Sequence, residues 1–220
     1  MKVKLYKQWN SGITRIDVVV VVLLVGVLFA MIMPIHEAAQ RRDANITCMG
    51  NLKQVNLALR VWELDNDKDY AELISKSNKS VAGLNTGQKA WRNLMGTSNF
   101  LSSAKVLQCP RDNETPITTN ADGLKIRISY FLNLDAMEGY PQELLDGDDN
   151  FVVGGVRVTS GILGLSSNTS ISWAPGRHGR VNNIGLADGS VEQQSSLGLQ
   201  NTVSFSFKGT PFSTNRIAIP

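Results

Sequence analysis

The sequence predicts a mixed α+β fold in which one long N-terminal helix packs on a small antiparallel β-sheet. An uncharged apolar run covers residues 18–35, and the chain after it keeps a helical periodicity, whereas the later chain alternates in the manner of strands. No regular alternation of strands with helices follows, which favours an antiparallel sheet over a parallel one.

The composition suits one globular domain of ordinary size that carries a membrane segment. The chain has 220 residues, of which 42% are hydrophobic and 19% are charged, and this is too apolar for a disordered chain. The formal charge of +3 is too small to indicate nucleic-acid binding, so we expect no nucleic-acid partner. Two cysteines exclude a disulfide-framework miniprotein and a four-cysteine zinc site.

Residues 18–35 are long enough to cross a membrane as a helix. At a rise of ~1.5 Å per residue the run covers about 27 Å, close to the ~30 Å hydrocarbon core. Three lysines and Arg15 precede it, and no acidic residue occurs before Asp17. The positive-inside rule therefore places the N-terminus in the cytoplasm and the following chain outside. A cleaved secretory signal and a plain signal anchor are two interpretations of this segment.

A third interpretation comes from residues 11–17, Ser-Gly-Ile-Thr-Arg-Ile-Asp. They resemble the N-terminus of the type IV prepilin family, which includes the pseudopilins of type II secretion. The matching residues are Gly12, Ile13, Thr14, Ile16 and Asp17, together with Pro34, which corresponds to a proline common in pilin helices. The resemblance implies a basic leader over residues 1–12, cleavage after Gly12 by a prepilin peptidase, and N-methylation of Ile13.

The resemblance also implies a role for Asp17. The family has glutamate at this position, which pairs with the N-terminal amine of a neighbouring subunit in the membrane or filament. Asp17 is one methylene shorter than glutamate, and Arg15 stands where the family usually has an apolar residue.

Beyond Pro34, an apolar stripe predicts that the helix continues into the exported domain. Its members recur at four- and three-residue steps on one helix face: Cys48, Leu52, Val55, Leu59 and Trp62. We therefore expect one helix over residues 13–64, transmembrane over about 16–35, and a globular β-rich domain over residues 65–220. Proline removes one backbone hydrogen bond, so we expect a kink at Pro34, with two helices as the alternative.

The rest of the chain is expected to form strands, turns and loops. Apolar and polar residues alternate over residues 125–134, which predicts a strand, and further strands are expected over 151–158, 170–173 and 202–207. A loop is expected over 75–87, and a short helix that packs Trp91 over 90–95. Two acidic clusters, residues 65–69 and 146–150, are predicted to be solvated turns rather than calcium sites.

A hairpin is predicted over residues 181–193, with Asp188 and Gly189 in a two-residue type I′ turn. His178 precedes this hairpin and is separated from Asp188 by nine residues. Together with residues 47–54 and 109–112, this spacing resembles a pilin-like family that joins a prepilin N-terminus to a domain ending in a His-x9-Asp-Gly motif. The resemblance implies a pilin-like fold.

His178 and Asp188 are the candidate catalytic or metal-binding pair, because a hairpin could bring them together and a His–Asp pair can orient a base or hold a metal ion. No recognisable nucleophile motif accompanies them, and the other histidine, His36, falls at the membrane boundary. We therefore expect no catalytic residue, no metal ion and no cofactor. His178 is interpreted as a histidine that is hydrogen-bonded at the entry of the hairpin, in a structural motif with Asp188 and Gly189.

Cys48 and Cys109 are candidates for a disulfide, which an exported domain would permit. Such a bridge would tie the helix to the sheet domain and contribute about 4 kcal/mol to stability in the chain-entropy model. Two buried thiols that act as small apolar groups are the alternative.

The expected function is structural rather than enzymatic. We expect a pilin-like or pseudopilin subunit of a type IV pilus or of a type II secretion-like assembly, anchored in the inner membrane with its domain in the periplasm or outside the cell. The expected partners are a prepilin peptidase, other pilin-like subunits and membrane lipid. The alternative is a monomeric, membrane-tethered binding module that uses the helix only for export and anchoring. A tethered hydrolase has only His178 and Asp188 in its favour.

Overall fold

The computed structural model describes residues 12, 14–66, 91, 101, 103–114, 118–119, 125–137, 139–211 and 213–220. The chain divides into two compact units, Met1–Asp43 and Ala44–Pro220. Helices and an antiparallel sheet together make the fold mixed α+β, as the sequence predicts. The loop expected over residues 75–87 lies outside the described residues, as do Ile13 and most of the short helix expected over residues 90–95.

Helix α1 (Arg15–Asn66) begins in the first unit and ends in the second. It is one helix through Pro34, so the alternative of two separate helices is wrong. Thr14 caps its start: Thr14 Oγ1 accepts the Asp17 N–H at 3.2 Å, and Asp17 Oδ2 accepts the Thr14 N–H at 2.8 Å. This reciprocal pair is a capping box, with Asp in the place of the usual Glu.

The first unit contains the apolar half of α1. Arg15–Met33 is long and apolar enough to cross a membrane, and a signal sequence near an N-terminus would also fit that description. Its large apolar side chains between residues 18 and 33 are 44–72% exposed within the protein. Burial against other parts of the chain therefore does not explain why these residues are apolar.

The second unit is built on a six-stranded antiparallel sheet in the order β10-β9-β4-β3-β11-β7. These strands are β3 (Tyr130–Asn133), β4 (Leu144–Asp148), β7 (Gly161–Ser166), β9 (Val181–Leu186), β10 (Val191–Ser195) and β11 (Thr214–Ile219). A second sheet, in the order β6-β5-β8, consists of β5 (Phe151–Val153), β6 (Val156–Arg157) and β8 (Ile171–Trp173). A separate pair is formed by β1 (Thr118–Thr119) and β2 (Lys125–Ile126).

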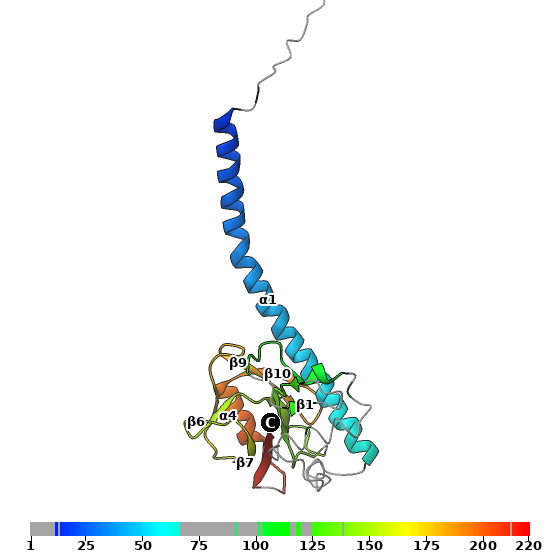
Figure 1. The fold of residues 1–220 in the computed structure, drawn as a ribbon. Helices are drawn as coiled ribbons and strands as arrows, with labels where there is room; N and C mark the ends of the chain where they lie inside the picture. Colours follow the sequence, from blue (N-terminus) through cyan, green and yellow to red (C-terminus); the bar gives the residue numbers. More distant parts are fainter. Residues whose placement is uncertain are drawn as a thin grey trace, which may run out of the picture. The chain divides into compact units, whose positions relative to one another are not determined.

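The six-stranded sheet separates two apolar cores. On one face, the predicted stripe of α1 from Cys48 to Trp62 packs with Tyr130 and Leu132. On the other face, side chains such as Phe131 pack in the second core with residues of helix α4 (Ser196–Ser206) and of the small sheet. In the ribbon, α4 lies across the strands from the cyan end of α1 (Figure 1). The α1 stripe is fully buried, which confirms the role expected for it.

The strand predictions are partly correct. Residues 170–173 are confirmed by β8, whereas 125–134 contains the two short strands β2 and β3, and 151–158 contains the antiparallel pair of β5 and β6. The strand predicted over residues 202–207 is wrong, because this stretch belongs to helix α4. Ser195 caps that helix by accepting the Gly198 N–H at 3.2 Å, and its buried residues follow helical spacing: Leu199, Val203 and Ser206.

The hairpin of β9 and β10 is present, but its predicted turn is wrong. The Gly189 N–H donates to the Leu186 carbonyl at 3.0 Å, and the Leu186 N–H donates to the Ser190 carbonyl at 2.9 Å. The connection therefore has three residues rather than two, with Gly189 at a positive φ of 91°. This geometry fits a type I turn followed by a glycine bulge.

Candidate functional site

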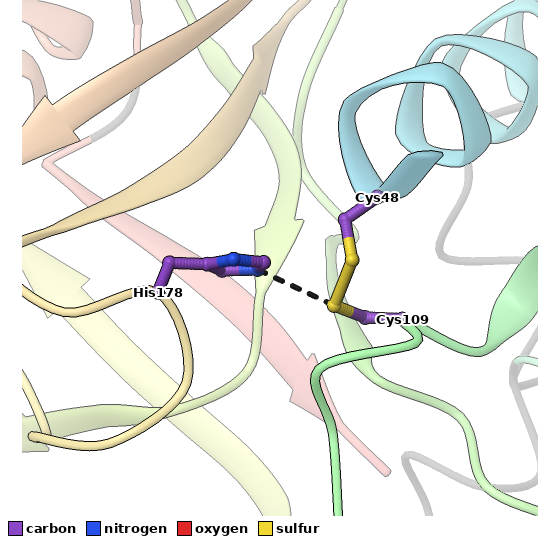
Figure 2. Close-up of side chains that lie close together, drawn as sticks. All are labelled: Cys48, Cys109 and His178. Carbon is purple, nitrogen blue, oxygen red and sulfur yellow. Dashed lines mark hydrogen bonds between the residues drawn. A yellow bond between two sulfur atoms is a disulfide. The ribbon is translucent and has the colours of Figure 1, made fainter. Parts of the chain in front are cut away.

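The three motifs singled out in the sequence meet in one buried junction of the second unit. Cys48 of α1 and Cys109, which follows the 3-10 helix η2 (Ala104–Leu107), form a disulfide with a Cα–Cα distance of 4.9 Å. The His178 ring points at this bridge, with Nε2 at 3.3 Å from Cys109 Sγ (Figure 2). Of the two alternatives left open by the sequence, the structure has the disulfide rather than two thiols.

The His178 side chain is completely buried and is held from two sides. Its Nδ1 lies 2.9 Å from Asn45 Oδ1 on α1, and its Nε2 lies 3.3 Å from Asn183 Nδ2 on β9. Because the Asn45 oxygen only accepts, it assigns the Nδ1 proton, and Nε2 then accepts from the Asn183 amide. His178 is thus hydrogen-bonded before the first strand of the hairpin, as its structural interpretation requires.

Next to His178 lies a buried cluster of charged side chains that the sequence analysis missed. Arg177 pairs with Asp149 at 2.6 Å and with Asp112 at 2.8 Å, and donates to the Ser129 carbonyl at 2.9 Å. Arg127 pairs with the same two carboxylates, at 3.0 Å from Asp112 and 2.8 Å from Asp149. Two guanidinium groups and two carboxylates therefore form a closed network.

Burial and pairing shift the ionisation of this network in opposite directions. Burial raises the pKa of Asp112, but Arg177, a hydrogen bond from Ser129, Arg127 and the backbone N–H of Glu114 together more than offset it, so the pKa lies below its ordinary value. Burial dominates at Asp149, whose pKa is raised although the same two arginines oppose the rise. Burial lowers the pKa of Arg177 and the surrounding carboxylates raise it, with a net rise. Arg177 is therefore a permanent cation inside the domain.

Strand β4 corrects the prediction for residues 146–150, which are not a solvated turn. Asp146 and Asp148 are fully buried on this central strand. The register of β4 against β9 shifts between Leu144 and Asp146, and such a bulge changes the face toward which following side chains point. Asp148 Oδ2 accepts the Asn183 N–H at 2.7 Å and lies 3.4 Å from His178 Nε2.

Asp146 has a different environment from Asp148. Among the residues that the structure describes, neither of its carboxylate oxygens has a hydrogen-bond partner. Burial raises the pKa of Asp146 well above its ordinary value; the nearby Asn56 amide opposes this rise and the Asp148 carboxylate adds to it. Asp146 therefore favours its neutral form inside the domain.

The structure does not bring His178 and Asp188 together, which corrects the expectation that the hairpin could do so. His178 precedes β9 and Asp188 follows it, so the strand of ~20 Å separates them. Asp188 is exposed and its carboxylate accepts the Ser190 N–H at 2.8 Å, while its carbonyl accepts from Arg60 of α1 at 3.1 Å. A Cβ at Gly189 would lie 2.7 Å from Arg60 Nη1, so this glycine permits the close approach of α1.

The N-terminal site residues are only partly described. Gly12 is exposed, and Asp17 takes part in the capping box with Thr14. Cleavage after Gly12 and methylation of Ile13 remain predictions.

A surface hollow of about 270 Å³ adjoins the charged network. Its polar walls include Arg111, Asp112, Glu114, Asn150, Arg157 and Arg177. Arg157 pairs with Glu114 across the hollow, and Asn150 Oδ1 has no hydrogen-bond partner among the described residues. This arrangement could accept a small polar ligand, but the sulfurs of the adjoining junction are joined in the disulfide and offer no free nucleophile.

The residues that sequence reasoning missed are those that complete the junction: Asn45, Arg127, Asp148, Asp149, Arg177 and Asn183. A signal was present, because Arg111 and Asp112 follow Cys109 closely and Arg177 directly precedes His178, which places charges next to motif residues. In comparisons with known proteins, no family model, curated protein or solved structure matches this chain.

Proposed function

We propose that this chain is a pilin-like structural subunit of an envelope assembly, of the type IV pilus or type II secretion kind. In this proposal a prepilin peptidase cuts after Gly12, the apolar half of α1 stays in the inner membrane, and the second unit faces the periplasm or the exterior. Subunits then associate through their apolar helices, and the proposed partners are other pilin-like chains.

The observation that carries the proposal is the difference in burial between the apolar side chains of the two halves of helix α1. Within Arg15–Asn66, the large apolar side chains up to residue 33 are exposed in the protein, and a regular stripe from Cys48 to Trp62 is fully buried in the domain core. A soluble protein rarely exposes so many adjacent apolar side chains, which instead favour lipid or other helices as their surroundings. The disulfide in the second unit favours an oxidising compartment for the domain.

The first experiment is the intact mass of the N-terminal peptide from purified membranes. A chain that begins at Ile13 and carries one extra methyl group would support prepilin processing. A chain that begins at Met1, or one cut near Gln40, would indicate a signal anchor or a secreted domain, and the filament proposal would be abandoned.

Assembly is tested by crosslinking in membranes with variants of Asp17. Asp17→Ala is expected to abolish ladders of crosslinked subunits, and Asp17→Glu to retain them. Because Asp17 also caps α1, Thr14→Ala is the matched control: it removes the Thr14 hydroxyl from the cap but keeps the carboxylate, and ladders should persist. Ladders that survive Asp17→Ala would count against assembly through this carboxylate.

A monomeric, membrane-tethered binding module is the second candidate, and the polar hollow favours it. Asn150, whose Oδ1 is buried and has no hydrogen-bond partner in the described part of the chain, and the partly exposed Arg111 both line this hollow. Wild-type protein that shows the processed N-terminus but forms no crosslinked ladder would favour this candidate over a filament subunit.

A further inference from the structure

Cys48, Cys109 and His178 bring together side chains that, with the two cysteines reduced to thiolates, are of the types that hold metal ions in proteins. Cys48 Sγ, Cys109 Sγ and one ring nitrogen of His178 all lie within 4.8 Å of one another, and all three residues are buried. A fourth donor is at hand, because Asp148 Oδ2 lies 3.4 Å from His178 Nε2. We propose that in the dithiol form of the chain Cys48, Cys109, His178 and Asp148 bind one Zn²⁺ ion, which formation of the disulfide releases.

Two of the six distances between the proposed ligand atoms already suit tetrahedral zinc. With Zn–S of about 2.3 Å and Zn–N or Zn–O of about 2.0–2.1 Å, neighbouring ligand atoms stand roughly 3.3–3.8 Å apart. The distance from Nε2 to Cys109 Sγ is 3.3 Å, and the distance from Nε2 to Asp148 Oδ2 is 3.4 Å. Reduction would allow the two sulfurs to separate to this range by small rotations of their side chains.

The surroundings orient these donors for a metal ion. Asn45 Oδ1 accepts the Nδ1 proton of His178, which leaves the Nε2 lone pair facing Cys109, Asp148 and Asn183. A second partner of this kind on the other ring nitrogen is typical of metal-bound histidine. Asp148 is likewise fixed, since its Oδ2 accepts the backbone and side-chain N–H groups of Asn183 at 2.7 and 3.0 Å.

The acceptor atoms His178 Nε2 and Asp148 Oδ2 lie 3.4 Å apart in a fully buried place, and in the disulfide form the Asn183 amide donates to both. In the zinc form the metal ion would take the place of this amide at Nε2. Two thiolates, one carboxylate and Zn²⁺ carry a net charge of −1. Arg177, which pairs mainly with Asp112 and Asp149, also has Nη1 at 3.9 Å from Asp148 Oδ1.

The chemistry balances without a further group. Two thiols bind Zn²⁺ and release two protons. An organic disulfide then oxidises the site: the two thiolates give up two electrons and form the Cys48–Cys109 bond, the oxidant is reduced to two thiolates, and Zn²⁺ leaves. Zinc and the disulfide thus exclude each other, and a reducing compartment favours the zinc form. The proposal does not depend on the proposed function.

The test uses the full chain in detergent, reduced with a phosphine in the absence of oxygen and supplied with Zn²⁺. Metal analysis after removal of free ions should find one zinc per chain in the reduced protein and none in the oxidised protein. Co²⁺ in place of zinc should give thiolate-to-cobalt charge-transfer absorption and the strong visible bands of a tetrahedral site. Reduced, folded wild-type protein that retains no zinc would overturn the proposal, and so would a cobalt spectrum without charge-transfer absorption.

Variants locate the ligands. His178→Gln and Asp148→Asn should each weaken zinc binding at least tenfold in competition with a chelator, and Cys48→Ser with Cys109→Ser should abolish it. Asp188→Asn is the matched control in the same sequence motif and should bind zinc as the wild type does, because Asp188 lies at the far end of β9. Undiminished zinc binding by the double serine variant would contradict the assignment, and the wild-type measurements decide the proposal if a variant fails to fold.

Discussion

The carboxylate of Asp146 occupies the space that a side chain at position 185 would need. Asp146 on β4 pairs with Gly185 on β9, and a Cβ at position 185 would collide with Asp146 Oδ1 and stand 2.7 Å from Asn56 Nδ2. The buried acid and the asparagine of α1 therefore fit against the sheet only because a glycine lies across from them.

Gly185→Ala is expected to lower the free energy of unfolding by about 1–3 kcal/mol, because the added methyl group must displace buried polar side chains. The measurement is chemical unfolding of the full chain in detergent, followed by tryptophan fluorescence. Gly164→Ala in β7 is the matched control, since a Cβ there meets no atom of the described residues within 4 Å, and it should change stability by no more than about 0.5 kcal/mol. Equal losses in the two variants would show that the Asp146 contact does not matter.

Asp146→Asn should change how stability depends on pH. The pKa of Asp146 is raised by burial, so the folded state holds this proton more tightly than the unfolded state, where the pKa is near ~3.9. Its contribution is full below the unfolded pKa and is lost as the pH rises through the folded pKa, by up to about 1.4 kcal/mol per pH unit. The variant should therefore lose less stability between about pH 4 and pH 7.

The measurement is thermal unfolding across this pH range, with the difference between variant and wild type as the quantity of interest. Glu143 and Asp149, whose pKa values are also raised mainly by burial, are present in both proteins and cancel in the difference. Asp112 acts in the opposite sense: its pKa is lowered, so its contribution is lost on acidification. Parallel curves for variant and wild type would show that Asp146 does not titrate in this range.

Arg177→Met should destabilise the protein by about 3–5 kcal/mol. It removes a buried cation and leaves Asp112 and Asp149 to share Arg127 alone, and uncompensated buried charge is costly. Arg216→Met is the matched control, because Arg216 pairs with Asp135 at the surface with its own side chain 54% exposed. That loss should stay below about 1 kcal/mol in the same unfolding measurement, and comparable losses would refute a special role for the buried network.

The sequence predicted those helices and strands whose buried residues recur at a regular spacing. The α1 stripe and β8 follow from apolar spacing alone. The spacing of Val203, Phe205 and Phe207 is typical of a strand. However, Leu199, one turn earlier, shows that the buried face is helical, with Ser195 as the cap of the helix.

The candidate site was less predictable, because it depends on contacts between distant segments. Asp146 and Asp148 resemble turn residues in any local window, and only pairing of β4 with β3 and β9 makes them central. Burial of Asp148 depends on Asn183, and that of Asp112 and Asp149 depends on Arg127 and Arg177. Short-range patterns contain no information about such pairing.

The position of the disulfide has a mechanical consequence. The second unit begins at Ala44, and Cys48 follows only about one helical turn later. A pulling force applied along α1 would reach the covalent cross-link to Cys109 before it could separate the apolar stripe from Leu52 to Trp62 from the sheet. In the oxidised protein, pulling the helix out of the domain would therefore require breaking the disulfide bond. In the reduced protein, the helix would separate at the much lower force that pulls packed side chains apart.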